Sequence, residues 1–262
     1  MVSSVLTNQR QLHLQPNQID LTSNNKTKSM YFTPRLLVSF LVLVVIPKNS
    51  YCAAQTIELG ACSDFAVMAG SAVSCAGTSA CRVMRGYLGI SPGTSITGKW
   101  VVGRKFPRKQ VKTTKSNACA NDGLAAWKQG GSLSGTSLAS GELGGKTFTP
   151  GVYRYSGALT ISPASGKVYL DAKGNRNAKF IFYATTTLTT AARTQIVLKN
   201  GASPANVYWI LGTAATLGAD SILKGTLIAG SAITIGSNGR IRGRAIAQTA
   251  VTCASACYVQ KL

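Results

Sequence analysis

Few side chains in this 262-residue sequence could carry acid–base, nucleophilic or metal chemistry. The single histidine is His13, so none follows from Gln55 onward. A Ser-His-Asp or Cys-His site needs that base, and a His-ligated metal site needs that ligand, so the sequence excludes both from this part of the chain. The acids that remain there are Glu58, Asp64, Asp122, Glu142, Asp171 and Asp220.

These acids are poorly placed for carbohydrate chemistry or calcium binding. Polysaccharide hydrolysis uses paired carboxylates, and a calcium site gathers several oxygen ligands. Only Glu58 and Asp64 are close in sequence, and Asp220 corresponds to Asn238 one repeat later, so no acid recurs along one face. The sequence therefore predicts a protein that is not an enzyme and holds no metal or cofactor.

The sequence does contain a short phrase that recurs every eighteen residues. Residues 213–216, 231–234 and 249–252 read Thr-Ala-Ala-Thr, Ser-Ala-Ile-Thr and Thr-Ala-Val-Thr, and residues 221–225 match residues 239–243 at the same interval. A fixed period with glycine punctuation is typical of a solenoid. The pattern predicts an all-β solenoid in the form of a three-sided β-helix, with about six residues on each side.

Looser copies of the phrase lie upstream, and strand alternation assigns a face to each of its positions. The third residue should point into the core: Val73, Ile96, Leu159, Leu188, Ala215, Ile233 and Val251. The second should point outward: Ala72, Ser95, Ala158, Thr187, Ala214, Ala232 and Ala250. The fourth should also point outward: Ser74, Thr97, Thr160, Thr189, Thr216, Thr234 and Thr252. One wall is thus expected to be flat and uncharged.

The neighbouring strand differs from this wall. Ile222 and Lys224, then Arg240 and Arg242, take its outward positions, so charge is expected there. Simple strand propensity on a solvated sheet is the alternative explanation of the threonines. That explanation would scatter Lys, Glu and Gln among them, and the seven phrases contain none.

One segment is predicted to be helical and another to be a basic loop. Residues 116–129 are rich in alanine, begin with a Ser or Asn cap and run into Gly130-Gly131, which predicts a short helix beside the solenoid. The preceding loop is a candidate site for an anionic partner, with a solvated connector as the alternative. Its basic residues are Lys99, Arg104, Lys105, Arg108, Lys109, Lys112 and Lys115.

The first 54 residues predict export. Residues 1–29 are polar and predicted to be disordered, unless the true start is Met30, and residues 30–54 resemble a signal peptide. Arg35 precedes an apolar run over residues 36–46, which is too short to span a bilayer, although a signal anchor is the alternative. Residues 55–262 are expected to form the mature domain, with no membrane span.

The mature chain is cysteine-containing and strongly basic. It would keep Cys62, Cys75, Cys81, Cys119, Cys253 and Cys257, an even number that predicts disulfides in an exported chain. Pairs at short spacing are 75 with 81 and 253 with 257, but the sequence leaves the pairing open.

The formal charge of +21 for the whole chain favours attraction to an anionic polysaccharide or cell surface, or simply a solvated basic surface.

Several longer phrases resemble the microbial ice-binding (antifreeze) family, and the cysteine-bearing start resembles its algal branch. Residues 86–98, GYLGISPGTSITG, and 141–162, GELGGKTFTPGVYRYSGALTIS, carry the most specific motifs, and further matches cover nearly all of residues 57–252. The resemblance implies a discontinuous right-handed β-helix with a helix alongside, in which the N-terminal segment closes the solenoid beside a late coil. It also implies a secreted, extracellular protein whose partner is the ice crystal surface.

The resemblance further implies that ice binds to the flat wall, where many family members carry a Thr-Ala/Gly-x-Thr/Asn phrase. Together with the outward positions above, the candidate ice-binding residues are Thr94, Thr97, Thr186, Thr187, Thr189, Thr213, Ala214, Thr216, Ser231, Ala232, Thr234, Thr249, Ala250 and Thr252. We expect a monomer with no obligate protein partner. The alternatives are a solenoid adhesin or polyanion-binding module that uses the basic loop, and a β-helix carbohydrate enzyme.

Overall fold

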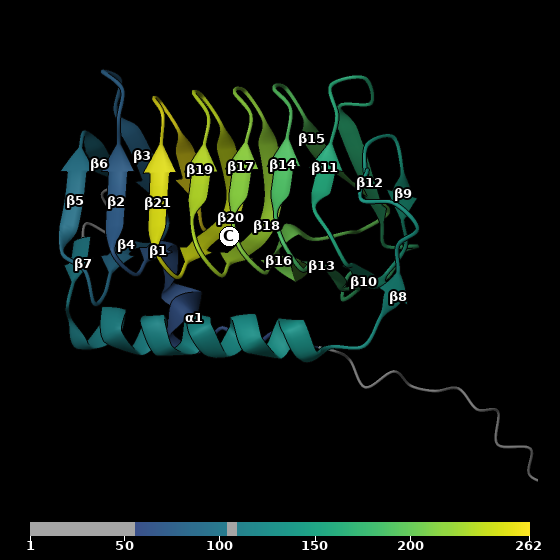
Figure 1. Cartoon of the computed structure of the whole chain (residues 1–262), viewed down its shortest axis with the longest axis horizontal. Helices are drawn as coiled ribbons and strands as arrows, with labels where there is room; N and C mark the ends of the chain where they lie inside the picture. Colours follow the sequence, from purple (N-terminus) through teal and green to yellow (C-terminus); the bar gives the residue numbers. More distant parts are fainter. Residues whose placement is uncertain (1–55, 104–108) are drawn as a thin grey trace, which may run out of the picture. The chain divides into compact units, whose positions relative to one another are not determined.

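The computed structural model describes residues 56–103 and 109–262. The predictions for the leader, the signal peptide and three basic residues (Arg104, Lys105 and Arg108) lie outside these described residues. Within them, every strand pairing is parallel, and the strands form two sheets beside one long helix (Figure 1). No helix in the described part of the chain is long and apolar enough to cross a membrane.

The smaller sheet contains all seven of the phrases found in the sequence. In spatial order its strands are β11 (Leu159–Ile161), β14 (Leu188–Thr190), β17 (Ala215–Leu217), β19 (Ile233–Ile235), β21 (Ala250–Cys253), β2 (Ala72–Cys75) and β5 (Ser95–Gly98). The N-terminal strand β2 lies beside β21, near the C-terminus. The strand order is therefore discontinuous in the chain, as the family resemblance implies.

The larger sheet consists of two rows of strands that share β18 (Ile222–Ala229) and β20 (Arg240–Ala247). The first row pairs the start of these strands with β9 (Thr147–Phe148), β12 (Lys167–Asp171), β15 (Gln195–Lys199), β22 (Tyr258–Gln260), β3 (Cys81–Met84) and β6 (Trp100–Val102). The second row pairs their end with β8 (Thr136–Ser137), β10 (Gly151–Tyr155), β13 (Phe180–Ala184), β16 (Val207–Leu211), β1 (Phe65–Ala69), β4 (Tyr87–Ile90) and β7 (Lys109–Val111).

Glycine allows the two shared strands to bend between the rows. Gly225 and Gly243 are register partners with φ of 115° and 153°, a backbone conformation that side chains disfavour. A Cβ on Gly243 would also collide with the Gly225 backbone. Short 3₁₀ turns at Gly60–Asp64 and Pro204–Asn206 complete the elements.

The core consists of side chains stacked in register. Of the predicted inward residues, six are at most 1% exposed, and Ile96, in the edge strand β5, is partly buried against them. In the second row, Trp209 is fully buried and stacks on Phe182 with ring centroids 4.5 Å apart. Parallel strands bring equivalent residues of successive phrases together, so the sequence period becomes a continuous apolar core.

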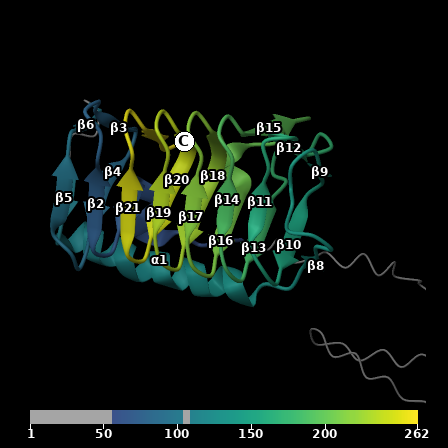
Figure 2. The ribbon, with the colours of Figure 1, turned by 45° about the horizontal axis from the view of Figure 1, so that its top comes forward.

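The helix α1 (Thr114–Ser132) packs along the second row and is longer than predicted (Figures 1 and 2). Its N-cap is Thr113, not Ser116 or an asparagine, and Thr113 and Ser116 form a reciprocal capping box. The helix ends at Ser132, one residue beyond the predicted stop at Gly130-Gly131. Gly130 is buried against Ile210, where a Cβ would clash. A buried stripe of small residues lets the helix lie close to the sheet: Ser116, Cys119, Gly123, Ala126 and Gly130.

The predicted basic loop is also corrected. Residues 100–102 form β6, residues 109–111 form β7, and the helix begins at Thr114. These short strands form because the backbones of β3 and β4 offer unpaired edges, which β6 and β7 fill. The basic composition of this segment gave no indication that β6 pairs with β3 and β7 with β4.

Two disulfides are present within residues 56–103 and 109–262. Cys62–Cys119 joins the first 3₁₀ turn to α1, and Cys75–Cys81 closes the turn between β2 and β3. The short-spaced pair 75 and 81 is therefore bonded, whereas Cys253 and Cys257 are buried thiols in this structure. Disulfides favour an extracellular protein.

Candidate functional site: the threonine wall

The outward face of the seven-stranded sheet, which we call the threonine wall, is built from the repeated phrase. The register pairs Thr160, Thr189, Thr216, Thr234, Thr252, Ser74 and Thr97 in one unbroken row. The inward residues Leu188, Ala215, Ile233 and Val251 pair in the adjacent row. The predicted alternation of faces is thus confirmed along the sheet.

Exposure agrees with this assignment. Thr189, Thr216, Thr234 and Thr97 are exposed, and the other residues of their row are half-buried. The second-position row of Ala, Ser and Thr is exposed or half-buried, and so is the first-position row, which includes Thr94, Thr186, Thr213, Ser231 and Thr249. Every candidate wall residue therefore reaches the surface. The fourth-position residues lie in the strands of one sheet, and the first-position residues lie in the segments that lead into those strands.

The backbone hydrogen bonds of the wall continue beyond the ends of its short strands. Four of its strands begin only at the third position of the phrase. Nevertheless, the first-position N–H groups of Thr213, Ser231, Thr249 and Ser71 each donate to the first-position carbonyl of the neighbouring strand segment, at 2.6–3.0 Å. The backbone ladder thus extends through both outward rows and holds them rigid.

Hydroxyl groups also interact across strands. The Ser74 Oγ donates to the Thr252 Oγ1 at 3.2 Å, and the Ser231 Oγ lies 3.4 Å from the Thr249 Oγ1. β-branched threonine has few χ1 rotamers, so methyl and hydroxyl groups hold fixed positions on such a sheet.

A sixth-position row, which the sequence interpretation missed, widens the wall. It consists of Ser162, Ala191, Gly218, Gly236, Ala254 and Ala76, and ends in Lys99 beyond β5. These residues follow each strand by one position, so the eighteen-residue period could have revealed them.

A carboxylate lies at the opposite edge of the wall. Glu142 forms a parallel bridge with Thr160, and it accepts hydrogen bonds from the Thr160 Oγ1 at 2.8 Å and the Gly144 and Ser162 N–H groups at 2.7 and 3.1 Å. Burial raises the pKa of the Glu142 carboxyl, but these hydrogen bonds and Lys146 outweigh burial, so the pKa is lowered. The wall is uncharged along its strands, with charge only at its two edges.

Three of the five remaining acids, Asp64, Asp122 and Asp171, have structural contacts. The Asp64 carboxylate lies 3.5 Å from the Lys115 Nζ and 3.8 Å from the Lys261 Nζ, the Asp122 Oδ2 accepts from the Ala61 N–H at 2.7 Å, and Asp171 caps a turn. The only group of potential metal ligands among the described residues is Cys81, Cys253 and Cys257.

The described members of the predicted anion-binding set lie on several different elements, so their common site stays a prediction. Lys99 follows β5, Lys109 begins β7, and Lys112 lies in a turn with a φ of 48°. Lys115 is in the first turn of α1, paired with Asp64 and 5.1 Å from the centre of the Tyr87 ring. Positive charge gathers instead on the first row, where Lys224, Arg240 and Arg242 point outward, as expected for the strand beside the wall.

The fold and the wall together define a class of protein: stacked parallel strands with one flanking helix and a flat surface of small and hydroxyl side chains. A family model described as "Ice-binding-like" matches residues 67–257. This chain belongs to that family, and as a member it is not an enzyme.

Individual relatives support the assignment. An ice-binding protein of Nostoc sp. (strain HG1) is 36% identical over 198 residues, which cover 72% of this chain and 69% of that protein. Ice-binding protein K1-A of Typhula ishikariensis is 27% identical over 220 residues, covering 76% and 86%. The crystal structure of the ice-binding protein from the Antarctic ascomycete Antarctomyces psychrotrophicus has a TM-score of 0.71 and 35% identity, covering 78% of this chain and 97% of that one.

Proposed function

We propose that this protein adsorbs to ice through the threonine wall and thereby inhibits ice growth and recrystallisation. The observation that carries the proposal is the register: seven strands place hydroxyl-bearing residues in one straight, solvent-facing row. The ice-binding relatives named above support the same function.

The size of the wall suits adsorption to a crystal. Each outward side chain occupies a cell of about 4.8 by 6.6 Å, so two outward rows on the seven strands cover about 450 Å². Fixed methyl groups order neighbouring water, and fixed hydroxyl groups anchor it at a small further cost in entropy. Many weak contacts made at once then resist displacement by liquid water.

The same proposal includes the finer features of the fold and its location. The register partners Thr216 and Thr234 are eighteen residues apart, which supports a three-sided coil of that length in the C-terminal half. A right-handed coil is proposed because crossovers between parallel strands of one sheet are almost always right-handed. The disulfides and the relatives support a secreted, extracellular protein, and the monomeric state stays a prediction. The algal-type branch stays a prediction, because the similar proteins named above come from a cyanobacterium and fungi.

An ice-affinity partition tests the proposal. The full chain is expressed for export, labelled with a fluorophore and exposed to a slowly growing ice hemisphere, beside Thr216→Lys and Gln195→Lys variants. Both variants add one exposed charge, but Gln195 lies on the first row. We expect the wild type and Gln195→Lys to enter the ice and Thr216→Lys to be excluded. Exclusion of folded wild type from the ice would overturn the proposal.

A second binding function is favoured by one specific feature of the first row. Lys224 is the register partner of Arg242, and like charges opposite each other destabilise a sheet. Burial, and then the nearby Arg242, lower the pKa of Lys224. Neither residue forms an ion pair with any described acid. An anionic polysaccharide would relieve this repulsion.

Heparin chromatography of the exported chain tests this second function. We expect a Lys224→Ala/Arg242→Ala variant to elute at clearly lower salt than the wild type. Equal elution of wild type and variant would exclude the first row as a polyanion site and leave ice adsorption as the only function proposed.

A further inference from the structure

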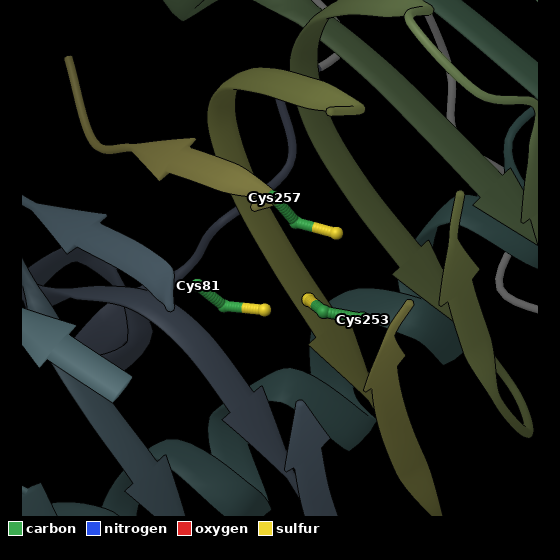
Figure 3. A group of neighbouring side chains, drawn as sticks. All are labelled: Cys81, Cys253 and Cys257. Carbon is green, nitrogen blue, oxygen red and sulfur yellow. The ribbon is translucent and has the colours of Figure 1, made fainter. Parts of the chain in front are cut away.

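Four cysteines meet at the turn that joins the threonine wall to the first row. Cys75 and Cys81 are joined, and the Sγ atoms of Cys81, Cys253 and Cys257 all lie within 4.8 Å of one another. Figure 3 shows these three sulfur atoms directed into the same small volume, with Cys81 on one segment and Cys253 and Cys257 on the adjacent one. All three cysteines are at most 1% exposed.

The cysteines occupy equivalent places in two neighbouring turns. Cys75 in β2 is the register partner of Cys253 in β21. Arg82, the residue after Cys81, is the register partner of Tyr258, the residue after Cys257. The turn from β21 to β22 therefore repeats the turn from β2 to β3, with a cysteine at each end of both.

Backbone hydrogen bonds hold the two turns together. The Ala76 N–H donates to the Cys253 carbonyl at 2.9 Å, the Arg82 N–H to the Cys257 carbonyl at 2.8 Å, and the Ala256 N–H to the Ser79 carbonyl at 3.3 Å. The turn that carries Cys253 and Cys257 is thus matched at both ends to a turn already closed by a disulfide.

We infer that Cys253 and Cys257 close as a third disulfide in the exported protein, stacked on Cys75–Cys81 in the neighbouring turn. The two thiols lose two protons and two electrons, and a small-molecule disulfide accepts them and becomes two thiols. Because both thiols are buried in the folded chain, this oxidation occurs while the turn is still open during folding. The inference does not depend on the function of the wall.

The folded surroundings act in opposite directions on the two thiols: the hydrogen bond with Cys257, and then burial, raise the pKa of Cys253, which fits oxidation before the turn is buried. Cys257 donates weak hydrogen bonds to the Ile235 and Gly236 carbonyls at 3.4 and 3.3 Å. The hydrogen bond with Cys253 and nearby backbone groups lower the pKa of Cys257, against the effect of burial. The same three sulfurs could also attract a thiophilic metal ion, but Cys81 is already committed to Cys75, which leaves only two thiols.

Peptide mapping distinguishes these states directly. The exported full chain, purified without reductant, is denatured in the presence of an alkylating agent and cut with trypsin. Cys253 and Cys257 then share the peptide 245–261, whereas Cys75 and Cys81 are in the peptide that ends at Arg82. We expect peptide 245–261 to be unalkylated, unlinked and lighter than its reduced form by two hydrogen atoms.

Other results would overturn the inference. Two alkylated cysteines in peptide 245–261 would show free thiols, and a link from that peptide to the one ending at Arg82 would show pairing between the turns. A metal ion in the native mass, with cysteines that alkylate only after chelation, would show a metal site.

Stability gives a second, independent test. A disulfide is lost whichever of its cysteines is replaced, so Cys253→Ala, Cys257→Ala and the double variant should lower the melting temperature by a similar amount, about 5 °C. Losses that instead add together in the double variant would show two independent thiols and would overturn the inference.

Discussion

The substitution Thr234→Tyr places a large ring at the centre of the threonine wall. Thr234 is exposed, with Thr216 and Thr252 as register partners on either side. With cells of about 4.8 by 6.6 Å, the ring keeps ice from its own cell and five adjoining ones, or about 40% of the two outward rows. The remaining contact is divided into two edge patches, so we expect thermal hysteresis to fall by at least about half.

The fold should tolerate this change. An exposed residue in a strand accepts tyrosine readily, and we expect the free energy of unfolding to change by less than about 0.5 kcal/mol. The matched control is Gln195→Tyr, which places the same ring on the exposed face of the first row. A nanolitre osmometer measures the hysteresis gap, and circular dichroism checks the fold. Equal hysteresis in both variants, whether lost or retained, would refute the assignment of ice binding to this wall.

Three further predictions concern the scaffold. Because the pKa of Glu142 is lowered from 4.5, its carboxylate stabilises the fold above that pH and loses this contribution as the pH falls through the lowered value. The urea midpoint of Glu142→Gln should therefore fall less on acidification than the midpoint of the wild type. Identical pH profiles of the two midpoints would contradict this prediction. Replacing Cys62 and Cys119 by alanine opens a link of sequence separation 57 and should cost about 4 kcal/mol, whereas an unchanged urea midpoint would argue against the bond. Trp209→Ala should cost about 3–5 kcal/mol in the same assay, because the indole is fully buried, and a smaller loss would mean that the core collapses around the gap.

The wall could be predicted from the sequence because its signal is periodic. In parallel strands, equivalent residues of successive coils become register partners, so the interval between Thr216, Thr234 and Thr252 translates directly into a row. Alternation along each strand then separates the inward Ile233 from the outward Thr234. Both inferences need only the chain's own repeat.

Features that depend on contacts between distant segments could not be predicted in this way. The sequence indicates Gly130 only as part of a helix stop, whereas the structure shows that it lets the helix lie close to Ile210. The sequence alone indicates a basic loop at Trp100–Val102, whereas in the structure these residues form the strand β6 by pairing with the edge of β3. Nothing in the sequence brings Cys62 to Cys119.

The most direct test of the central claim is the growth of a single ice crystal in a solution of the exported, oxidised wild-type protein. Between the melting and freezing points, ice adsorption predicts a faceted crystal that does not grow until a hysteresis gap is exceeded. A round crystal that grows freely in the presence of the folded protein would contradict the claim that the threonine wall binds ice.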